Sequence, residues 1–159
     1  MDKVLNVAYV SEGSLITTPK GQKEISQLKE GDLVLTHENE YKPILEVMKE
    51  SNVTFLEVVT LDGTSLNISP NELFQISNKR KGIFTPPMKK MASKLKREDF
   101  ISSHFNSDGS GQVYYQYDSI KSIAPSGTGV GYGLVVEDDA TFVVNGKIVC
   151  DNSHKVKVK

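Results

Sequence analysis

The stretch Ile25-Ser26-Gln27-Leu28-Lys29-Glu30-Gly31-Asp32-Leu33-Val34 returns later in the chain as Ala92-Ser93-Lys94-Leu95-Lys96-Arg97-Glu98-Asp99-Phe100-Ile101. Ser, Leu, Lys and Asp recur at the same offsets, and apolar residues recur where the next strand would begin. In each copy we expect a short helical turn whose Leu enters the core, then a turn ending at Asp and a strand. The alternative is that two common turn sequences coincide by chance.

A second, weaker pair of similar segments supports the repeat. Residues 55–62 (Phe-Leu-Glu-Val-Val-Thr-Leu-Asp) resemble residues 132–139 (Tyr-Gly-Leu-Val-Val-Glu-Asp-Asp), and a short apolar run follows each. A repeated unit of helical turn, strand and hairpin predicts a mostly β domain with a pseudo-twofold axis.

The remaining apolar residues alternate in short runs separated by turn residues, a pattern typical of strands. Asp62-Gly63 and Asn145-Gly146 are hairpin dipeptides. One or two short helical turns are expected, at 23–28 and 89–96, with another turn at 70–74. The Gly- and Ser-rich segments 106–112 and 124–131 are predicted to be mobile surface loops. The expected strands are 15–18, 33–36, 44–48, 55–61, 65–68, 101–103, 114–123, 132–136, 141–144 and 148–150.

Composition narrows the class of protein. A length of 159 residues with 38% hydrophobic and 25% charged residues fits one globular domain. No apolar run is long enough for a membrane span and no leader is evident, so we expect synthesis in the cytoplasm and no membrane partner. Cys150 is the only cysteine, which excludes an intrachain disulfide and a cysteine zinc cluster. We expect neither a metal nor another cofactor, and His37 is expected in an exposed turn.

Charge argues against nucleic acid as the main partner. The formal net charge is −1, whereas duplex binding depends on neutralising many phosphates. Residues 79–97 are locally basic. They form either a solvated surface or a phosphate-binding patch.

Four segments, taken in order, resemble the Hint (hedgehog/intein) family. The opening Tyr9-Val10-Ser11-Glu12-Gly13-Ser14-Leu15-Ile16 is similar to the start of an intein, and residues 25–34 continue the match. Residues 61–74 resemble the second conserved block, and residues 132–149 resemble the closing blocks. The resemblance implies a compact, pseudo-twofold Hint domain at 9–152, an N-terminal extension at 1–8 and a basic tail at 153–159.

The resemblance also implies a set of reactive positions. In the family, the thiol or hydroxyl of the first residue attacks the preceding carbonyl, and a Thr and a His of the second block activate that amide. A terminal Asn, preceded by His and followed by Cys, Ser or Thr, cyclises to release the downstream segment. Each step depends on one particular nucleophile, proton donor or carboxamide.

Most of these positions are altered in the present chain. The first residue falls on a phenol, the activating His on a carboxylate and the terminal Asn on another carboxylate. The resemblance therefore implies a degenerate intein without bond-breaking chemistry. The corresponding residues are Tyr9, Ser69 (block-two Thr), Glu72 (block-two His), Ala140 (a late-block His), Cys150 (penultimate His) and Asp151 (terminal Asn).

A register shifted by one residue after Gly146 leaves a second interpretation open. Asn152 would then be the terminal Asn and Ser153 the downstream nucleophile, so that C-terminal cleavage could survive without the first step. The alternative is that these residues begin a polar tail.

Three functional hypotheses follow from these observations. The first is a vestigial, inactive Hint domain that acts as a structural or protein-interaction module, with a phage virion as the expected assembly; this setting rests on analogy. The second is an autoprocessing domain whose activity is limited to cleavage at Asn152-Ser153. The third is a nucleic-acid-binding β domain that uses residues 79–97.

Overall fold

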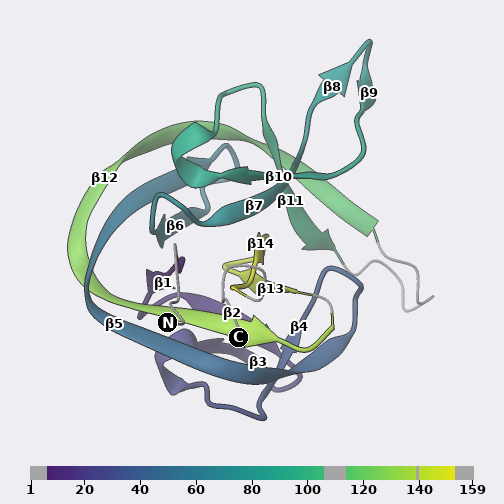
Figure 1. The fold of residues 1–159 in the computed structure, drawn as a ribbon. Helices are drawn as coiled ribbons and strands as arrows, with labels where there is room; N and C mark the ends of the chain where they lie inside the picture. Colours follow the sequence, from purple (N-terminus) through teal and green to yellow (C-terminus); the bar gives the residue numbers. More distant parts are fainter. Residues whose placement is uncertain (1–6, 106–113, 139, 153–159) are drawn as a thin grey trace, which may run out of the picture.

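The computed structural model describes residues 7–105, 114–138 and 140–152. The described chain is built almost entirely from strands, and its only helical elements are two 3-10 turns, η1 (Ile25–Gln27) and η2 (Ala92–Lys94) (Figure 1). This confirms the mostly β fold class. The strands are β1 (Val10–Ser11), β2 (Leu15–Thr18), β3 (Gly21–Glu24), β4 (Leu33–Leu35), β5 (Tyr41–Thr60), β6 (Ser65–Ile68), β7 (Leu73–Ser77), β8 (Lys79–Arg80), β9 (Ile83–Phe84), β10 (Met88–Met91), β11 (Phe100–Phe105), β12 (Tyr114–Val136), β13 (Thr141–Val144) and β14 (Lys147–Cys150).

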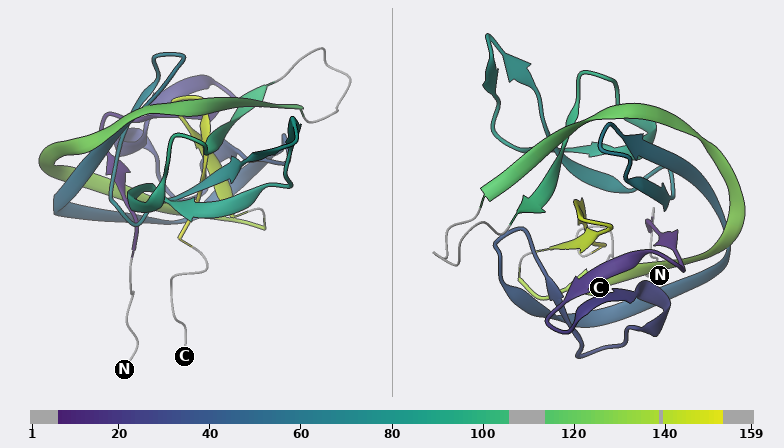
Figure 2. Two further views of the ribbon diagram at one scale, coloured as in Figure 1. Left: turned by 90° about the horizontal axis from the view of Figure 1, so that it is seen from above. Right: turned by 180° about the vertical axis from the view of Figure 1, so that it is seen from behind.

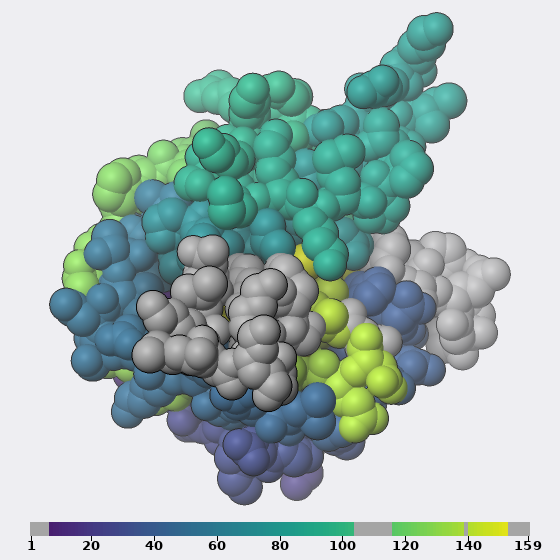
Figure 3. Space-filling model, viewed as in Figure 1, coloured from purple at the N-terminus to yellow at the C-terminus, as the bar shows by residue number. Residues whose placement is uncertain are grey.

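One extended sheet organises the domain. Its hydrogen-bonded order is β3-β2-β13-β14-β7-β11-β12-β1-β6-β5-β4, and β10 joins it through β7. The long strands β5 and β12 pair antiparallel and curve together around β13 and β14 (Figure 1). The β8–β9 hairpin forms a separate pair that projects from the body of the domain (Figure 3).

The long strands correct two expectations. Residues 44–48 and 55–61 belong to the single strand β5, and residues 114–123 and 132–136 belong to the single strand β12. The predicted loop at 124–131 is therefore wrong, because that segment pairs with β5. Its glycines lie at register shifts between Pro125 and Gly127 and between Gly129 and Gly131, where a glycine tolerates the irregular backbone. Segment 106–112 lies outside the described residues.

The internal repeat is real in three dimensions, as its backbone hydrogen bonds show. In each copy the backbone amide of the Leu closes the turn by donating to the carbonyl oxygen three residues earlier, at 3.1 Å in the first copy and 3.2 Å in the second. Each Asp then closes a tight turn by accepting, at its carboxylate, the amide three residues earlier, at 3.0 and 2.8 Å. The equivalent bonds are Leu28 N to Ile25 O and Leu95 N to Ala92 O, then Lys29 N to Asp32 Oδ2 and Lys96 N to Asp99 Oδ2.

Both copies supply the hydrophobic core with equivalent side chains. Ile25 and Ala92 are completely buried, and Leu28 and Leu95 are nearly so. They pack in one cluster with residues of the long strands, including Val58 and Leu134. The repeated motif therefore anchors the strand that follows each copy, β4 or β11, to the same core. No helix among the described residues is long and apolar enough to cross a bilayer.

Candidate functional site

The peptide bond between Ala8 and Tyr9 is held against the second-block turn. Strand β1 places it there, because Val10 pairs with Ile68 of β6 and the next residue, Ser69, then lies beside Tyr9. The Tyr9 amide donates to Ser69 Oγ at 2.8 Å, and the Ser69 amide donates to the Tyr9 carbonyl at 2.8 Å. The sequence-predicted Ser69 therefore contacts the amide nitrogen that follows Ala8.

Asn152 binds the same peptide from the other end of the chain. Its Oδ1 accepts the Ala8 amide at 2.9 Å, its Nδ2 donates to the Ala8 carbonyl at 3.0 Å, and its backbone amide donates to Leu134 O. The Asn152 side chain is buried, so both contacts are made away from bulk water. The two ends of the described chain consequently lie side by side (Figure 2).

Gly133 of β12 makes room for this contact. A Cβ atom at this position would overlap Asn152 Nδ2 and would lie 2.7 Å from the Ala8 carbonyl oxygen. The requirement is for space, because Gly133 is not among the residues with positive φ. Sequence reasoning missed Gly133, since a lone glycine within a strand does not reveal what approaches it.

Asn71 is a second residue that sequence reasoning missed. Its Nδ2 donates to Val7 O at 3.1 Å, and its Oδ1 accepts the Ser69 hydroxyl at 2.7 Å. Because the Ser69 hydroxyl donates its hydrogen bond to Asn71, its oxygen is oriented to accept the hydrogen bond from the Tyr9 amide. The signal available in the sequence was the Ser-x-Asn spacing, which favours local side-chain bonds of this kind.

The two carboxylates at family positions are buried and bonded to backbone amides. Glu72 Oε1 accepts the Leu73 amide at 2.9 Å, and Asp151 Oδ2 accepts the Val136 amide at 2.6 Å. Both residues are adjacent, or nearly so, to the residues that hold Ala8–Tyr9. The structure therefore brings Ser69 and Asn152 onto the Ala8–Tyr9 peptide, whereas the Glu72 and Asp151 side chains bind backbone amides elsewhere.

Tyr9 has a weakly acidic phenol in this setting. Burial raises its pKa, and the nearby negative charge of Glu50 raises it further. The backbone beside it is crowded, because a Cβ atom at Gly131 would lie 2.8 Å from Tyr9 Cβ. The phenol is thus neutral at physiological pH, and the glycine leaves room for the Tyr9 side chain.

The remaining predicted positions that the structure describes, Ala140 and Cys150, lie beside the start of β13 and at the end of β14. Cys150 is buried at the end of β14 and pairs with Thr141. Ala140 accepts the Asp151 amide at its carbonyl, and Ser153 lies outside the described residues. His37 lies in a turn as predicted, but its side chain is only partly exposed, because Nδ1 contacts Thr141 Oγ1 at 2.8 Å. In the described part of the chain, no three His, Cys, Asp or Glu side chains converge as metal ligands.

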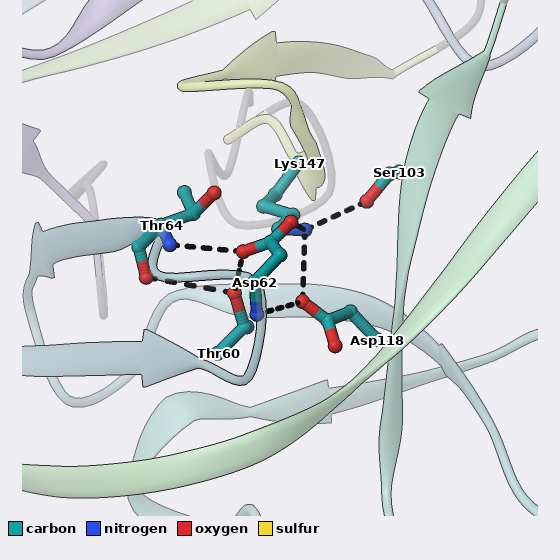
Figure 4. Close-up of polar contacts among 6 residues, drawn as sticks. All are labelled: Thr60, Asp62, Thr64, Ser103, Asp118 and Lys147. Carbon is teal, nitrogen blue, oxygen red and sulfur yellow. Dashed lines mark hydrogen bonds and ion pairs between the residues drawn. The ribbon is translucent and has the colours of Figure 1, made fainter.

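A second polar cluster lies around the buried ammonium group of Lys147 (Figure 4). Lys147 Nζ donates to Asp62 Oδ2 at 2.8 Å and to Ser103 Oγ at 2.9 Å, and lies 3.6 Å from Asp118 Oδ2. Burial would raise the pKa of Asp62, but hydrogen bonds from Lys147, Thr60 and Thr64 outweigh burial and hold it far below its usual range. This cluster links β14, β11, β12 and the β5–β6 turn, so its contacts are structural.

Comparison with known proteins identifies the fold. Residues 8–85 match the family described as the Hint domain. The gp41-1 intein superposes with a TM-score of 0.70 at 20% identity, covering 91% of this chain and 98% of that one. A DnaB intein from Synechocystis sp. PCC 6803 superposes with a TM-score of 0.75 at 20% identity, covering 91% and 98%. This chain is a Hint/intein-like domain. The DnaX mini intein from Spirulina platensis gives a TM-score of 0.70 at 19% identity, covering 90% and 99%, and no curated protein matches.

In this Hint domain the contacts around Ala8–Tyr9 have a clear chemical meaning. Ser69 Oγ accepts the Tyr9 amide and orients the peptide group, while Asn152 Nδ2 donates to the Ala8 carbonyl oxygen. A donor at that oxygen can stabilise the negative charge that develops there when a nucleophile attacks the carbonyl carbon. The side chain that follows this carbonyl is a phenol.

Proposed function

We propose that this Hint domain no longer breaks peptide bonds and serves as a structural or protein-interaction module. The observation that carries the proposal is the Ala8–Tyr9 peptide, which is fully bound by Ser69 and Asn152 but followed by Tyr9. The binding geometry is retained while the reacting atoms are absent.

The acyl shift fails for a geometric reason. A thiol or hydroxyl attached directly to Cβ reaches the preceding carbonyl through a five-membered ring. The Tyr9 oxygen lies at the far end of a rigid aromatic ring and cannot close such a ring on the Ala8 carbonyl. Its raised pKa also keeps the phenol protonated, which removes the nucleophilic form.

The proton donor of the second block is absent as well. Glu72 occupies the position of the family His, and its Oε1 already accepts the Leu73 amide. A carboxylate in that role accepts hydrogen bonds and cannot protonate the departing Tyr9 nitrogen.

The hypothesis of surviving C-terminal cleavage is less well supported by the geometry. In the register without an insertion, Asp151 stands at the terminal position. Asp151 has no carboxamide nitrogen. In the alternative register, Asn152 Nδ2 is held at the Ala8 carbonyl oxygen, 3.0 Å away, rather than left free to approach its own backbone carbonyl.

Intact-mass spectrometry tests the proposal. The full chain is incubated at neutral pH with and without hydroxylamine, which cleaves a thioester or ester but not an ordinary amide. We expect the unchanged mass in both samples over several days. A fragment ending at Ala8 would show that the acyl shift still occurs, and a fragment ending at Asn152 would support autoprocessing instead.

The proposed module needs partners, and the sheet offers two edges for them. The hydrogen-bonded order ends at β3 and at β4, and every residue of β3 is exposed. Exposed edges can pair with strands of another chain. A phage virion is the proposed setting, by analogy with degenerate Hint domains on mobile-element proteins; sedimentation of the chain with purified particles would test it.

A further inference from the structure

A cavity of about 360 Å³ lies between the turn that follows η2 and strand β12. Residues of the second repeat copy form one wall, and residues 120–123 of β12 form the other. Its apolar side chains are aliphatic, and its charged side chains are all cations. They are Leu95, Ile120 and Ile123, and Lys96, Arg97 and Lys121.

A β-bulge explains how consecutive residues of β12 share this cavity. In a regular strand Lys121 would face away from Ile120 and Ser122, because side chains alternate between the two faces. Here Ile120 pairs with Thr60 and Ser122 with Val59, so that Lys121 is the extra residue. Bulges redirect side chains in this way, and Lys121 consequently lines the same cavity as its neighbours.

The three cations have no acidic partner among the described residues. Lys96, Arg97 and Lys121 are exposed, and none of them forms an ion pair with a described side chain. Glu98, which is next to Arg97, is also exposed and makes no such pair. Lys90 of the same region differs, because it pairs with Asp99 at 2.8 Å. The charge at the cavity is therefore available to a ligand.

The first repeat copy provides an internal comparison. A cavity of about 270 Å³ lies beside Leu28, which is the counterpart of Leu95. It is lined by Lys20 and Lys23 but also by Asp32. The two cavities share one equivalent position, Leu28 and Leu95, and only in the second are all the charged lining residues cations.

We propose that the cavity beside η2 binds an acidic segment of a partner protein. An aliphatic side chain of that segment occupies the floor formed by Leu95 and Ile123, and its carboxylates pair with the three cations. Aliphatic walls favour this ligand over single-stranded nucleic acid, whose bases bind by stacking on aromatic side chains. The inference rests on the proposed role as a protein-interaction module and specifies the chemistry of its partner.

Fluorescence anisotropy with a labelled peptide of alternating Glu and Leu tests this site in the full chain. The variant Lys96→Glu/Lys121→Glu reverses two rim charges, and Lys20→Glu/Lys23→Glu makes the same charge change at the first cavity. We expect at least about tenfold weaker binding for the first variant and little change for the second. Methyl NMR of the wild-type chain should show peptide-dependent shifts at Ile120 and Ile123. Unchanged melting temperatures would establish that both variants fold.

Each contrary result overturns the assignment. Absence of peptide binding, equal weakening by both variants, or unshifted Ile120 and Ile123 methyls would show that this cavity is not the site. Binding of a labelled oligothymidine in place of the peptide would favour nucleic acid. An intact-mass measurement on the same samples separates the two proposals. Cleavage of the chain would refute the inactive domain, whereas an intact chain that binds no peptide would refute only the cavity.

Discussion

The cluster around Lys147 predicts that losing its counterions is more damaging than losing the lysine itself. The Lys147 side chain is 3% exposed, whereas those of Asp62 and Asp118 are 49% and 18% exposed. Asp62→Asn/Asp118→Asn leaves a buried ammonium without an opposite charge. Lys147→Met removes that ammonium, which contacts both carboxylates (Figure 4), and leaves two carboxylates that are at least partly exposed to water.

The exposure of each group sets the expected magnitudes. Breaking a buried ion pair by removing one partner costs about 3–5 kcal/mol. Because Asp62 is half exposed and water partly screens its interaction, we expect the double Asn variant to lose about 2–3 kcal/mol. Lys147→Met should lose only about 1 kcal/mol, since a hydrophobic side chain replaces a costly buried charge. The triple variant should resemble Lys147→Met rather than the sum of the two.

Urea unfolding followed by circular dichroism measures these differences, with the m-value as a check that the unfolded state is unchanged. Glu40→Gln is a matched control, because Glu40 is 62% exposed and pairs with Lys42 at 3.5 Å. Its expected loss is below about 0.5 kcal/mol. If Lys147→Met proved as destabilising as the double Asn variant, the buried cation would not be what the carboxylates neutralise, and the reasoning would fail.

Three further predictions concern pH, space and chemistry. The folded pKa values of Asp62 and Asp99 are depressed, because the hydrogen bonds each carboxylate accepts outweigh its burial. The stability that these ionised carboxylates contribute is therefore complete above the unfolded pKa of about 3.9 and is lost as the pH falls below it. The unfolding free energy of the wild type should consequently fall more steeply with decreasing pH than that of Asp62→Asn. Gly133→Ala should lower stability by about 2 kcal/mol or more, because the new methyl overlaps the Asn152–Ala8 contact, and thermal melting would detect it. Tyr9→Cys/Glu72→His should give a hydroxylamine-sensitive bond after Ala8 that wild type lacks; an unreactive variant would show that more than these two groups has been lost.

The sequence predicted the repeat well, because its physical basis is local. Each copy carries its own Leu for the core and its own Asp for the following turn, and these contacts span only three residues. The hairpin at Asn145-Gly146 was likewise visible, since two residues with positive φ define its turn.

The continuity of β5 and β12 could not be predicted in this way. Glycine and proline in residues 124–131 locally favour a loop, and the segment becomes a strand only because β5 lies alongside it with matching irregularities. The same limit applies to the candidate site. Ser69 and Tyr9 could be identified by resemblance, but the contact of Asn152 with Ala8 joins residues 144 positions apart and depends on the whole sheet.

The contact between Asn152 and Ala8 has a consequence for any larger polypeptide that contains this domain. The entropic cost of a loop depends on the separation of its ends, and grows with the number of flexible residues between them. Here more than a hundred residues fold between Ala8 and Asn152, and two hydrogen bonds hold these two residues together. Inserting this domain into a surface turn of a host protein should therefore cost little more entropy than inserting a few extra residues. The two host strands that flank the turn could then keep their register.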